Sequence, residues 1–127
     1  AVLGPPSALL NVFIAVIIID YATGLLRAKY ENSMNSYVGA KGIIKKISYM
    51  LAVALAHQVD LWLGTGDKFR SLSVSLFITN EVWSNIENLA VMGIVFPEPM
   101  IGKIKAIMSA DQLNKGRKPD DKHQKMS

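Results

Sequence analysis

The sequence predicts an all-α integral membrane protein with three transmembrane helices, a short interfacial C-terminal helix and a polar tail. Half of the 127 residues are apolar, and they are gathered into three long runs instead of being spread at helical or strand period. Such blocks are typical of a chain that lies in lipid. The formal net charge is +4, with most basic residues outside those runs. The length is that of one domain.

The first expected span covers residues 8–26 and would be roughly 28 Å long as a helix. Asp20 is its only charged residue. On a helix, Asp20, Thr23, Gly24 and Arg27 fall within an arc of about 100°. In one interpretation Asp20 makes a local pair near the inner end and Gly24 permits close helix approach. In the other, Asp20 lies in a permeation or gating path.

The start of the chain does not look like a secretory signal. Basic residues follow the first apolar run instead of preceding it, which argues against a signal peptide. The sequence begins at Ala1 with no initiator Met, so we expect a processed or clipped start.

The second expected span covers residues 47–63 and is extended inward by Lys45 and Lys46, whose long side chains can reach the membrane surface. The polar, basic stretch 28–44 before it is expected to be a loop with room for a short surface helix. Lys46, Tyr49, His57 and Asp60 fall within roughly 80° of arc. A proton relay through His57 is one interpretation, and a simple hydrogen bond to a neighbouring helix is the plainer one.

The third expected span, residues 72–96, would be roughly 37 Å long. A carboxylate at the centre of a bilayer costs several kcal/mol unless it has a partner or water. This helix therefore needs neighbouring helices, a water-filled space, or both. The short connection 64–71 predicts that spans two and three are antiparallel neighbours, and we hypothesise that His57 pairs with Glu81. The polar residues in the middle of the span share an arc of about 160°: Asn80, Glu81, Ser84, Asn85, Glu87 and Asn88.

Proline ends the third span, because Pro97 and Pro99 cannot continue it. Apolar residues then recur at helical spacing over 99–108, which predicts an interfacial helix, and residues 109–127 form a charged tail expected to be disordered. The expected division is a membrane domain of residues 1–108 and a tail of residues 109–127. Basic residues place the loop and the tail in the cytoplasm and the N-terminus outside. The expected membrane-surface basic residues are Arg27, Lys45, Lys46, Lys103 and Lys105.

Motifs for catalysis or cofactor binding are absent. The sequence contains no nucleophile elbow, zinc-protease, phosphate-loop or dinucleotide motif, and Glu81 and Glu87 lie about 120° apart on a helix, so they do not converge. There are no cysteines, which excludes disulfides and thiolate metal sites. His57 and His123 do not form a ligand cluster. We therefore expect no enzyme, no catalytic residue, no cofactor, no metal and no nucleic-acid partner, the basic tail being a solvated cytoplasmic segment.

Several short segments, in order and at similar spacing, give the chain a family resemblance. The segments are Asp20-Tyr21-Ala22-Thr23-Gly24, Lys41-Gly42-Ile43, Ala54-Leu55-Ala56-His57-Gln58-Val59-Asp60, Thr79-Asn80-Glu81, Ile86-Glu87-Asn88 and Gly93-Ile94-Val95-Phe96-Pro97-Glu98. Through them, residues 8–105 resemble the phage lysis and toxin-secretion holin family, which includes holins from phages of Gram-positive bacteria and the clostridial toxin-release holin. That family usually has more sequence ahead of its first span.

The resemblance implies a multi-pass protein of the bacterial host cytoplasmic membrane that homo-oligomerises in the lipid bilayer. It would open a large non-selective pore or lesion, with an endolysin or toxin as its functional partner. The hypothesis is that Glu81, Ser84, Asn85 and Asn88 face the subunit interior or an interface before opening and the lumen afterwards. The candidate pore-lining or interhelical polar residues are Asp20, Thr23, His57, Asp60, Asn80, Glu81, Ser84, Asn85, Glu87 and Asn88.

Two other functions are compatible with the same pattern. A small selective ion or proton channel, or a transporter, would use Asp20, His57 and Glu81 as its path. A membrane adaptor or antiholin would have the same fold without permeabilising the membrane.

Overall fold

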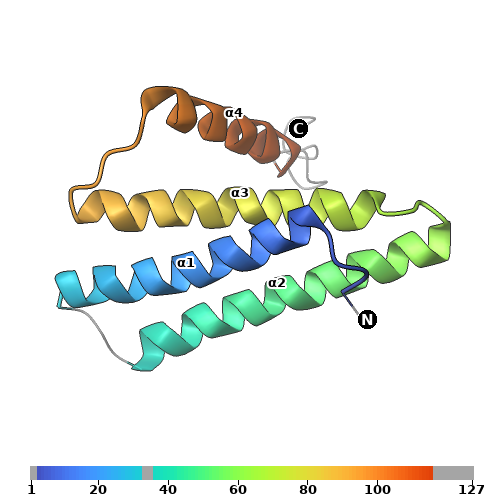
Figure 1. Cartoon of the computed structure of the whole chain (residues 1–127), viewed down its shortest axis with the longest axis horizontal. Coiled ribbons are helices and arrows are strands. Elements are labelled where there is room, and N and C mark those ends of the chain that lie inside the picture. Colours follow the sequence, from blue (N-terminus) through green and yellow to red (C-terminus); the bar gives the residue numbers. More distant parts are fainter. Residues whose placement is uncertain (1–2, 33–35, 116–127) are drawn as a thin grey trace, which may run out of the picture. The chain divides into compact units, whose positions relative to one another are not determined.

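The computed structural model describes residues 3–32 and 36–115, and within these ranges it is built from helices with no strand (Figure 1). The helices are α1 (Ala8–Tyr30), α2 (Ser36–Leu63), α3 (Lys68–Val91) and α4 (Glu98–Lys115). The predicted all-α class is therefore confirmed. The chain forms two compact units, Ala1–Val95 with the first three helices and Phe96–Ser127 with the fourth.

Helix α3 is the central element of the first unit. It packs along α1, beside which it lies in Figure 1. It also packs against α2, whereas α1 and α2 contact each other much less. A tight turn makes α2 and α3 antiparallel, as predicted. Gly64 and Gly66 both have φ of +68° in this turn, a conformation that glycine adopts without steric cost.

The apolar core lies towards the N-terminal half of α1. Phe13 of α1, Val53 of α2 and Val74 of α3 are almost fully buried there. Next to Phe13, Tyr49 and Phe77 stack with ring centroids 4.5 Å apart and planes inclined by 13°, a favourable arrangement for aromatic rings. This cluster joins all three helices through side-chain packing.

Large apolar side chains also cover the outside of the unit. Ile18, Leu51, Leu55 and Trp62 are each more than 60% exposed. In the described part of the chain, α1 is the helix that is long and apolar enough to cross a bilayer, with 23 residues and a mean hydropathy of 2.1. The core helix of a soluble protein or a signal sequence can have the same length and hydropathy. The three predicted spans therefore stay a prediction.

Helix boundaries differ from the expected ones. Helix α1 continues to Tyr30, supported by an ion pair of 2.7 Å between Arg27 Nε and Glu31 Oε1 at the helix-stabilising i,i+4 spacing. Helix α2 begins at Ser36, inside the stretch expected to be mainly loop. That stretch lacks proline, so nothing in it forces the helix to start later.

Helix α3 ends at Val91 instead of continuing to residue 96. Gly93 has φ of +91°, and the Ile94 and Gly93 amides donate to the carbonyls of Leu89 and Ala90, each over 3.0 Å. This is a Schellman closure, in which a left-handed glycine satisfies the last carbonyls of a helix. The glycine, not the prolines that follow it, ends α3.

Helix α4 continues beyond the predicted interfacial segment. It begins where the Pro97 carbonyl accepts hydrogen bonds from the Met100 and Ile101 amides, and Pro99 is tolerated because it lies in the first turn. It extends to Lys115 because no Gly or Pro occurs between Gly102 and Gly116. Residues 109–115 of the expected disordered tail are thus helical, and residues 116–127 lie outside the described residues.

An acidic side chain of α2 caps the N-terminus of α3. The Asp60 carboxylate is almost fully buried and accepts hydrogen bonds from Thr65 Oγ1 (2.6 Å) and from the amides of Phe69 (2.9 Å) and Arg70 (2.8 Å). These amides belong to the first turn of α3, whose N–H groups have no partner within the helix. Asp67 occupies the N-cap position but makes no capping bond.

The same end of the unit also holds the N-terminal segment. The buried Arg70 guanidinium donates to the Leu3 carbonyl over 2.9 Å and to Ser7 Oγ over 3.2 Å. Ser7 in turn caps α1 by accepting a 3.0 Å bond from the Leu10 amide. Arg70 therefore links the segment before α1 to the start of α3.

We expect Asp60→Ala to lower the free energy of unfolding by about 1–3 kcal/mol, because two amides of α3 lose their acceptor. Asp67→Ala should cost less than about 1 kcal/mol. The Asp67 side chain of its ion pair with Arg70 is 55% exposed, and ion pairs in contact with solvent contribute little. Denaturation of the detergent-solubilised variants measures both losses. Equal losses would contradict the assignment of Asp60 as the cap.

Candidate functional site

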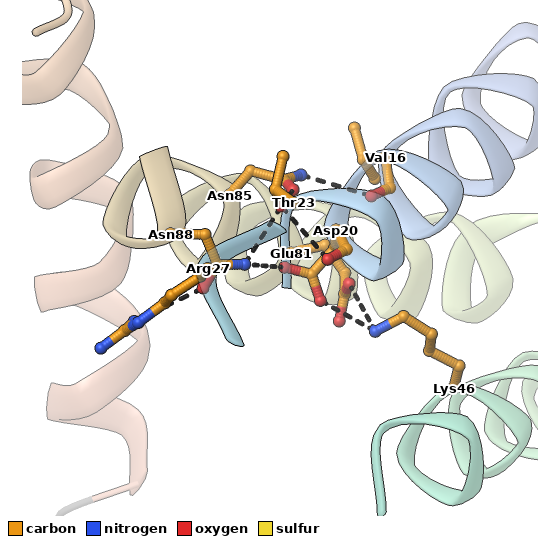
Figure 2. Close-up of polar contacts among 8 residues, drawn as sticks. All are labelled: Val16, Asp20, Thr23, Arg27, Lys46, Glu81, Asn85 and Asn88. Atoms are coloured by element: carbon orange, nitrogen blue, oxygen red, sulfur yellow. Dashed lines mark hydrogen bonds and ion pairs between the residues drawn. The ribbon is translucent and has the colours of Figure 1, made fainter. Parts of the chain in front are cut away.

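A group of polar side chains lies between the helices of the first unit (Figure 2). Helices α1 and α3 supply most of it, because residues spaced three or four apart on each helix face the other helix. Lys46 enters from α2. We call this group the polar cluster, and it consists of Asp20, Thr23, Arg27, Lys46, Glu81, Asn85 and Asn88.

Hydrogen bonds connect the uncharged members of the polar cluster. Thr23 Oγ1 donates to Asn85 Oδ1 over 2.8 Å, and Asn85 Nδ2 donates to the Val16 carbonyl over 3.3 Å. Asn88 Nδ2 donates to Thr23 Oγ1 (3.1 Å) and to Asp20 Oδ1 (3.3 Å). Both amide side chains are therefore satisfied between α1 and α3, as buried polar groups require.

Within the polar cluster, the Lys46 ammonium lies between the carboxylates of Asp20 and Glu81. Lys46 Nζ lies 2.8 Å from Asp20 Oδ2 and 3.5 Å from Glu81 Oε2 (Figure 2). The Glu81 side chain is 0% exposed, and neither of its oxygens accepts a hydrogen bond from the part of the chain that the structure describes. A buried carboxylate without full compensation is costly. Lys46 therefore partly compensates the charge that α1 and α3 bury at this level.

The structure brings together only part of the predicted residues. Ser84 and Asn80 are half-buried on α3, while Glu87 and Lys45 are exposed, as are Lys103 and Lys105 on α4. Asp60 and His57 lie far along α2 from the polar cluster, towards the turn. The predicted residues that the structure places in one cluster are Asp20, Thr23, Arg27, Lys46, Glu81, Asn85 and Asn88.

The hypothesis that His57 pairs with Glu81 is wrong. Glu81 has its ion pair with Lys46, and His57 instead lies beside Gly4, where an added Cβ would be 2.9 Å from its Nδ1. The reason is depth along the helices: His57 is about 9 Å from the end of α2 at the turn, whereas Glu81 is about 20 Å from the start of α3.

The sequence predicts Lys46 at the membrane surface and does not predict its contact with both carboxylates. The positions of the residues along the two helices could have indicated this contact. Counting from the turn along each helix places Lys46 about 25 Å away and Glu81 about 20 Å away. A lysine side chain is long enough to bridge that difference.

Comparison with known proteins gives the family. A family model described as the bacteriophage holin family matches residues 1–109. The chain belongs to the bacteriophage holin family. The resemblance inferred from the short segments is thus confirmed. Membership of this family implies association with the cytoplasmic membrane and oligomerisation in general.

Individual relatives of this holin-family protein come from bacteria and a phage. An uncharacterised protein of Listeria monocytogenes is 40% identical over 95 residues, which cover 75% of this chain and 68% of that protein. A probable holin of Bacillus phage phi105 is 28% identical over 111 residues, covering 87% of this chain and 82% of the phage protein. An uncharacterised 14.9 kDa protein of Clostridium perfringens is 32% identical over 92 residues, 72% and 70% of the two chains. No solved structure matches the holin-family chain.

We expect strong energetic coupling between Asp20 and Lys46 in a double-mutant cycle built from Asp20→Asn, Lys46→Met and the double variant. Lys46→Met alone should cost about 3–5 kcal/mol of unfolding free energy, because it leaves buried carboxylates without their cation. Adding Asp20→Asn should recover more than about 1 kcal/mol of that loss. Denaturation in detergent measures each term.

The matched control for this cycle is the exposed pair Arg27 and Glu31, whose side chains are 36% and 43% exposed. Its coupling should be about 0.3–0.5 kcal/mol. If the two pairs gave the same coupling, Lys46 would not have the role assigned to it.

Proposed function

We propose that this holin-family chain itself forms the membrane lesion. It accumulates in the cytoplasmic membrane, homo-oligomerises and opens a large non-selective pore through which an endolysin, or in a toxin locus a toxin, leaves the cell. The observation that supports this is the polar cluster: one face of α3 is polar enough to line water, yet it is buried against α1. The similarity to a probable phage holin agrees with the proposal.

The proposal treats α1, α2 and α3 as three transmembrane spans with the N-terminus outside and the C-terminus inside. Exposed apolar side chains on each helix support it, among them Ile18 on α1, Leu51 on α2 and Leu72 on α3. Three of the residues that lower the hydropathy of α3, Glu81, Asn85 and Asn88, are buried away from that surface, whereas Glu87 is exposed. Lipid would therefore contact a more apolar surface than the average over the whole helix indicates.

The same polar side chains can be satisfied in two arrangements, one with α1 and α3 packed together (closed) and one with these helices apart (open). In the closed subunit, α1 and α3 satisfy each other's polar groups. If they separate within an oligomer, Asn85 and Asn88 face water, which can replace each lost hydrogen bond at a net cost of only about 0.5–1.5 kcal/mol. In this proposal, contacts between subunits offset the summed cost of the lost hydrogen bonds, and this balance permits a timed transition.

The selective-channel alternative has less support. Its path requires Asp20, His57 and Glu81 in succession, and His57 lies near the turn, away from the other two. A non-permeabilising adaptor or antiholin would have the same closed subunit, so the decisive observation is lysis. That the chain is not an enzyme stays a prediction.

A disulfide between α1 and α3 should block lysis. Thr23→Cys and Asn85→Cys replace two side chains that are in direct contact at 2.8 Å, and the chain has no other cysteine. We expect cells that express the oxidised double variant, together with an endolysin lacking a signal peptide, to retain turbidity and membrane potential. Reduction of the disulfide should restore abrupt depolarisation followed by lysis.

Each single-cysteine variant is the control, because it has the same loss of polar contact without the cross-link. Both should depolarise and lyse cells under oxidising and reducing conditions alike. Lysis by the fully cross-linked variant would show that α1 and α3 need not separate. Depolarisation without release of endolysin by the unmodified chain would favour a narrow channel, and healthy cells would favour the antiholin function.

A further inference from the structure

The weak contact between α1 and α2 leaves an open cleft on one side of the three-helix unit. Its wider part has a volume of about 690 Å³, and Tyr21, Lys41, Gly42 and Lys45 contribute to its walls. A second part of about 430 Å³ shares Tyr21 and Lys46 with the first. We call the two parts together the α1–α2 cleft.

Glycines keep the wider part of the cleft open. A Cβ built at Gly42 would have no other atom within 4 Å, and one built at Gly39 would lie 4.0 Å from the Tyr21 hydroxyl. Larger residues at these positions of α2 would project into the space between the helices. The cleft is therefore a consequence of the sequence of α2.

Charge differs between the two parts of the cleft. The wall of the wider part includes Asp20, whose carboxylate is paired with Lys46. Lys41 and Lys45 are exposed there, and neither has a carboxylate partner within the residues that the structure describes. Lys45 Nζ lies 5.6 Å from the centroid of the Tyr49 ring. The narrower part is apolar apart from Lys46 and Tyr21, and its other walls are Ile17, Ile18, Ile43, Ile47 and Met50.

The order of the two parts matches the axis of a membrane lipid. The basic part lies near the C-terminal end of α1 and the N-terminal end of α2. The apolar part lies closer to the N-terminal end of α1 and to the C-terminal end of α2. From Leu25 to Ile17 the wall runs about 12 Å along α1, and from Lys41 to Met50 about 13 Å along α2. With the proposed topology, the basic end faces the cytoplasmic surface, where anionic lipids give a negative potential.

We propose that the α1–α2 cleft binds one anionic phospholipid of the cytoplasmic leaflet, with its headgroup phosphate between Lys41 and Lys45 and an acyl chain along Ile17, Ile18 and Ile47. This proposal rests on the proposed membrane placement.

Native mass spectrometry of the full chain, solubilised in detergent and mixed with phosphatidylglycerol or phosphatidylcholine, tests the lipid site. We expect a one-to-one adduct with phosphatidylglycerol that is at least tenfold tighter than any adduct with phosphatidylcholine. Lys41→Gln combined with Lys45→Gln should weaken the phosphatidylglycerol adduct roughly tenfold or more, given the contribution of a lysine near an anionic surface. Gly42→Leu should also weaken it, because it fills the cleft while keeping both charges.

The control variant combines Lys29→Gln with Lys103→Gln, which removes the same charge from exposed positions outside the cleft and should leave the adduct unchanged. An equal loss in the control, or no loss with Gly42→Leu, would overturn the lipid site and indicate surface attraction only. Displacement of the lipid by millimolar inorganic phosphate would contradict a role for the apolar part. Adducts of a second copy in place of lipid would assign the cleft to oligomer contact.

The measurement is independent of lysis, so the two proposals can fail separately. Loss of the lipid adduct in a variant that still lyses cells would remove the lipid site and leave the pore proposal intact. Tight lipid binding by a chain that never permeabilises membranes would contradict the pore proposal and leave the lipid site intact.

Discussion

The structure depends on how two carboxylates are accommodated between packed helices. Asp20 comes from α1 and Glu81 from α3, and a single ammonium, that of Lys46, reaches both. Because α1 and α2 otherwise contact each other little, this ion pair links all three helices at the level where the apolar core is absent. At the other end, Phe13, Val53 and Val74 make the link by packing. The subunit is thus joined by hydrophobic contact in one half and by charge in the other.

The two kinds of link respond differently to separation. Apolar side chains that leave the core can still contact lipid, so they give little free-energy preference between a closed subunit and an oligomer in a membrane. The polar cluster does give such a preference, because its groups must form hydrogen bonds either with one another or with water. A switch between a closed and a water-lined state is therefore expected to depend on Asn85, Asn88 and the ion pair more than on the aromatic contacts.

The sequence predicted the helical class, the antiparallel α2 and α3, and the polar side of α3, because these follow from blocks of apolar residues and from spacing around one helix. It did not predict which helix would cover that side. Lys46 and His57 share an arc of α2, and only their distances from the turn distinguish the residue that reaches Glu81. The predicted end of α3 is wrong for another reason. The prediction relies on Pro97, whereas Gly93 is the stronger signal for the end of the helix. The distinction between a buried and a water-lined polar face cannot come from one sequence, because both satisfy the same groups.

The separations along the chain suggest an order of assembly during synthesis. Asp20 and Lys46 are 26 residues apart, whereas the hydrogen bonds between α1 and Asn85 or Asn88 join residues at least 61 apart. A nascent α1 in lipid would have an uncompensated carboxylate, and α2 emerges before α3. Lys46 can therefore neutralise Asp20 while α3 is still being made. Glu81 then meets a cation that already has one carboxylate partner, and it is the last of the three charged groups of this ion pair to be made.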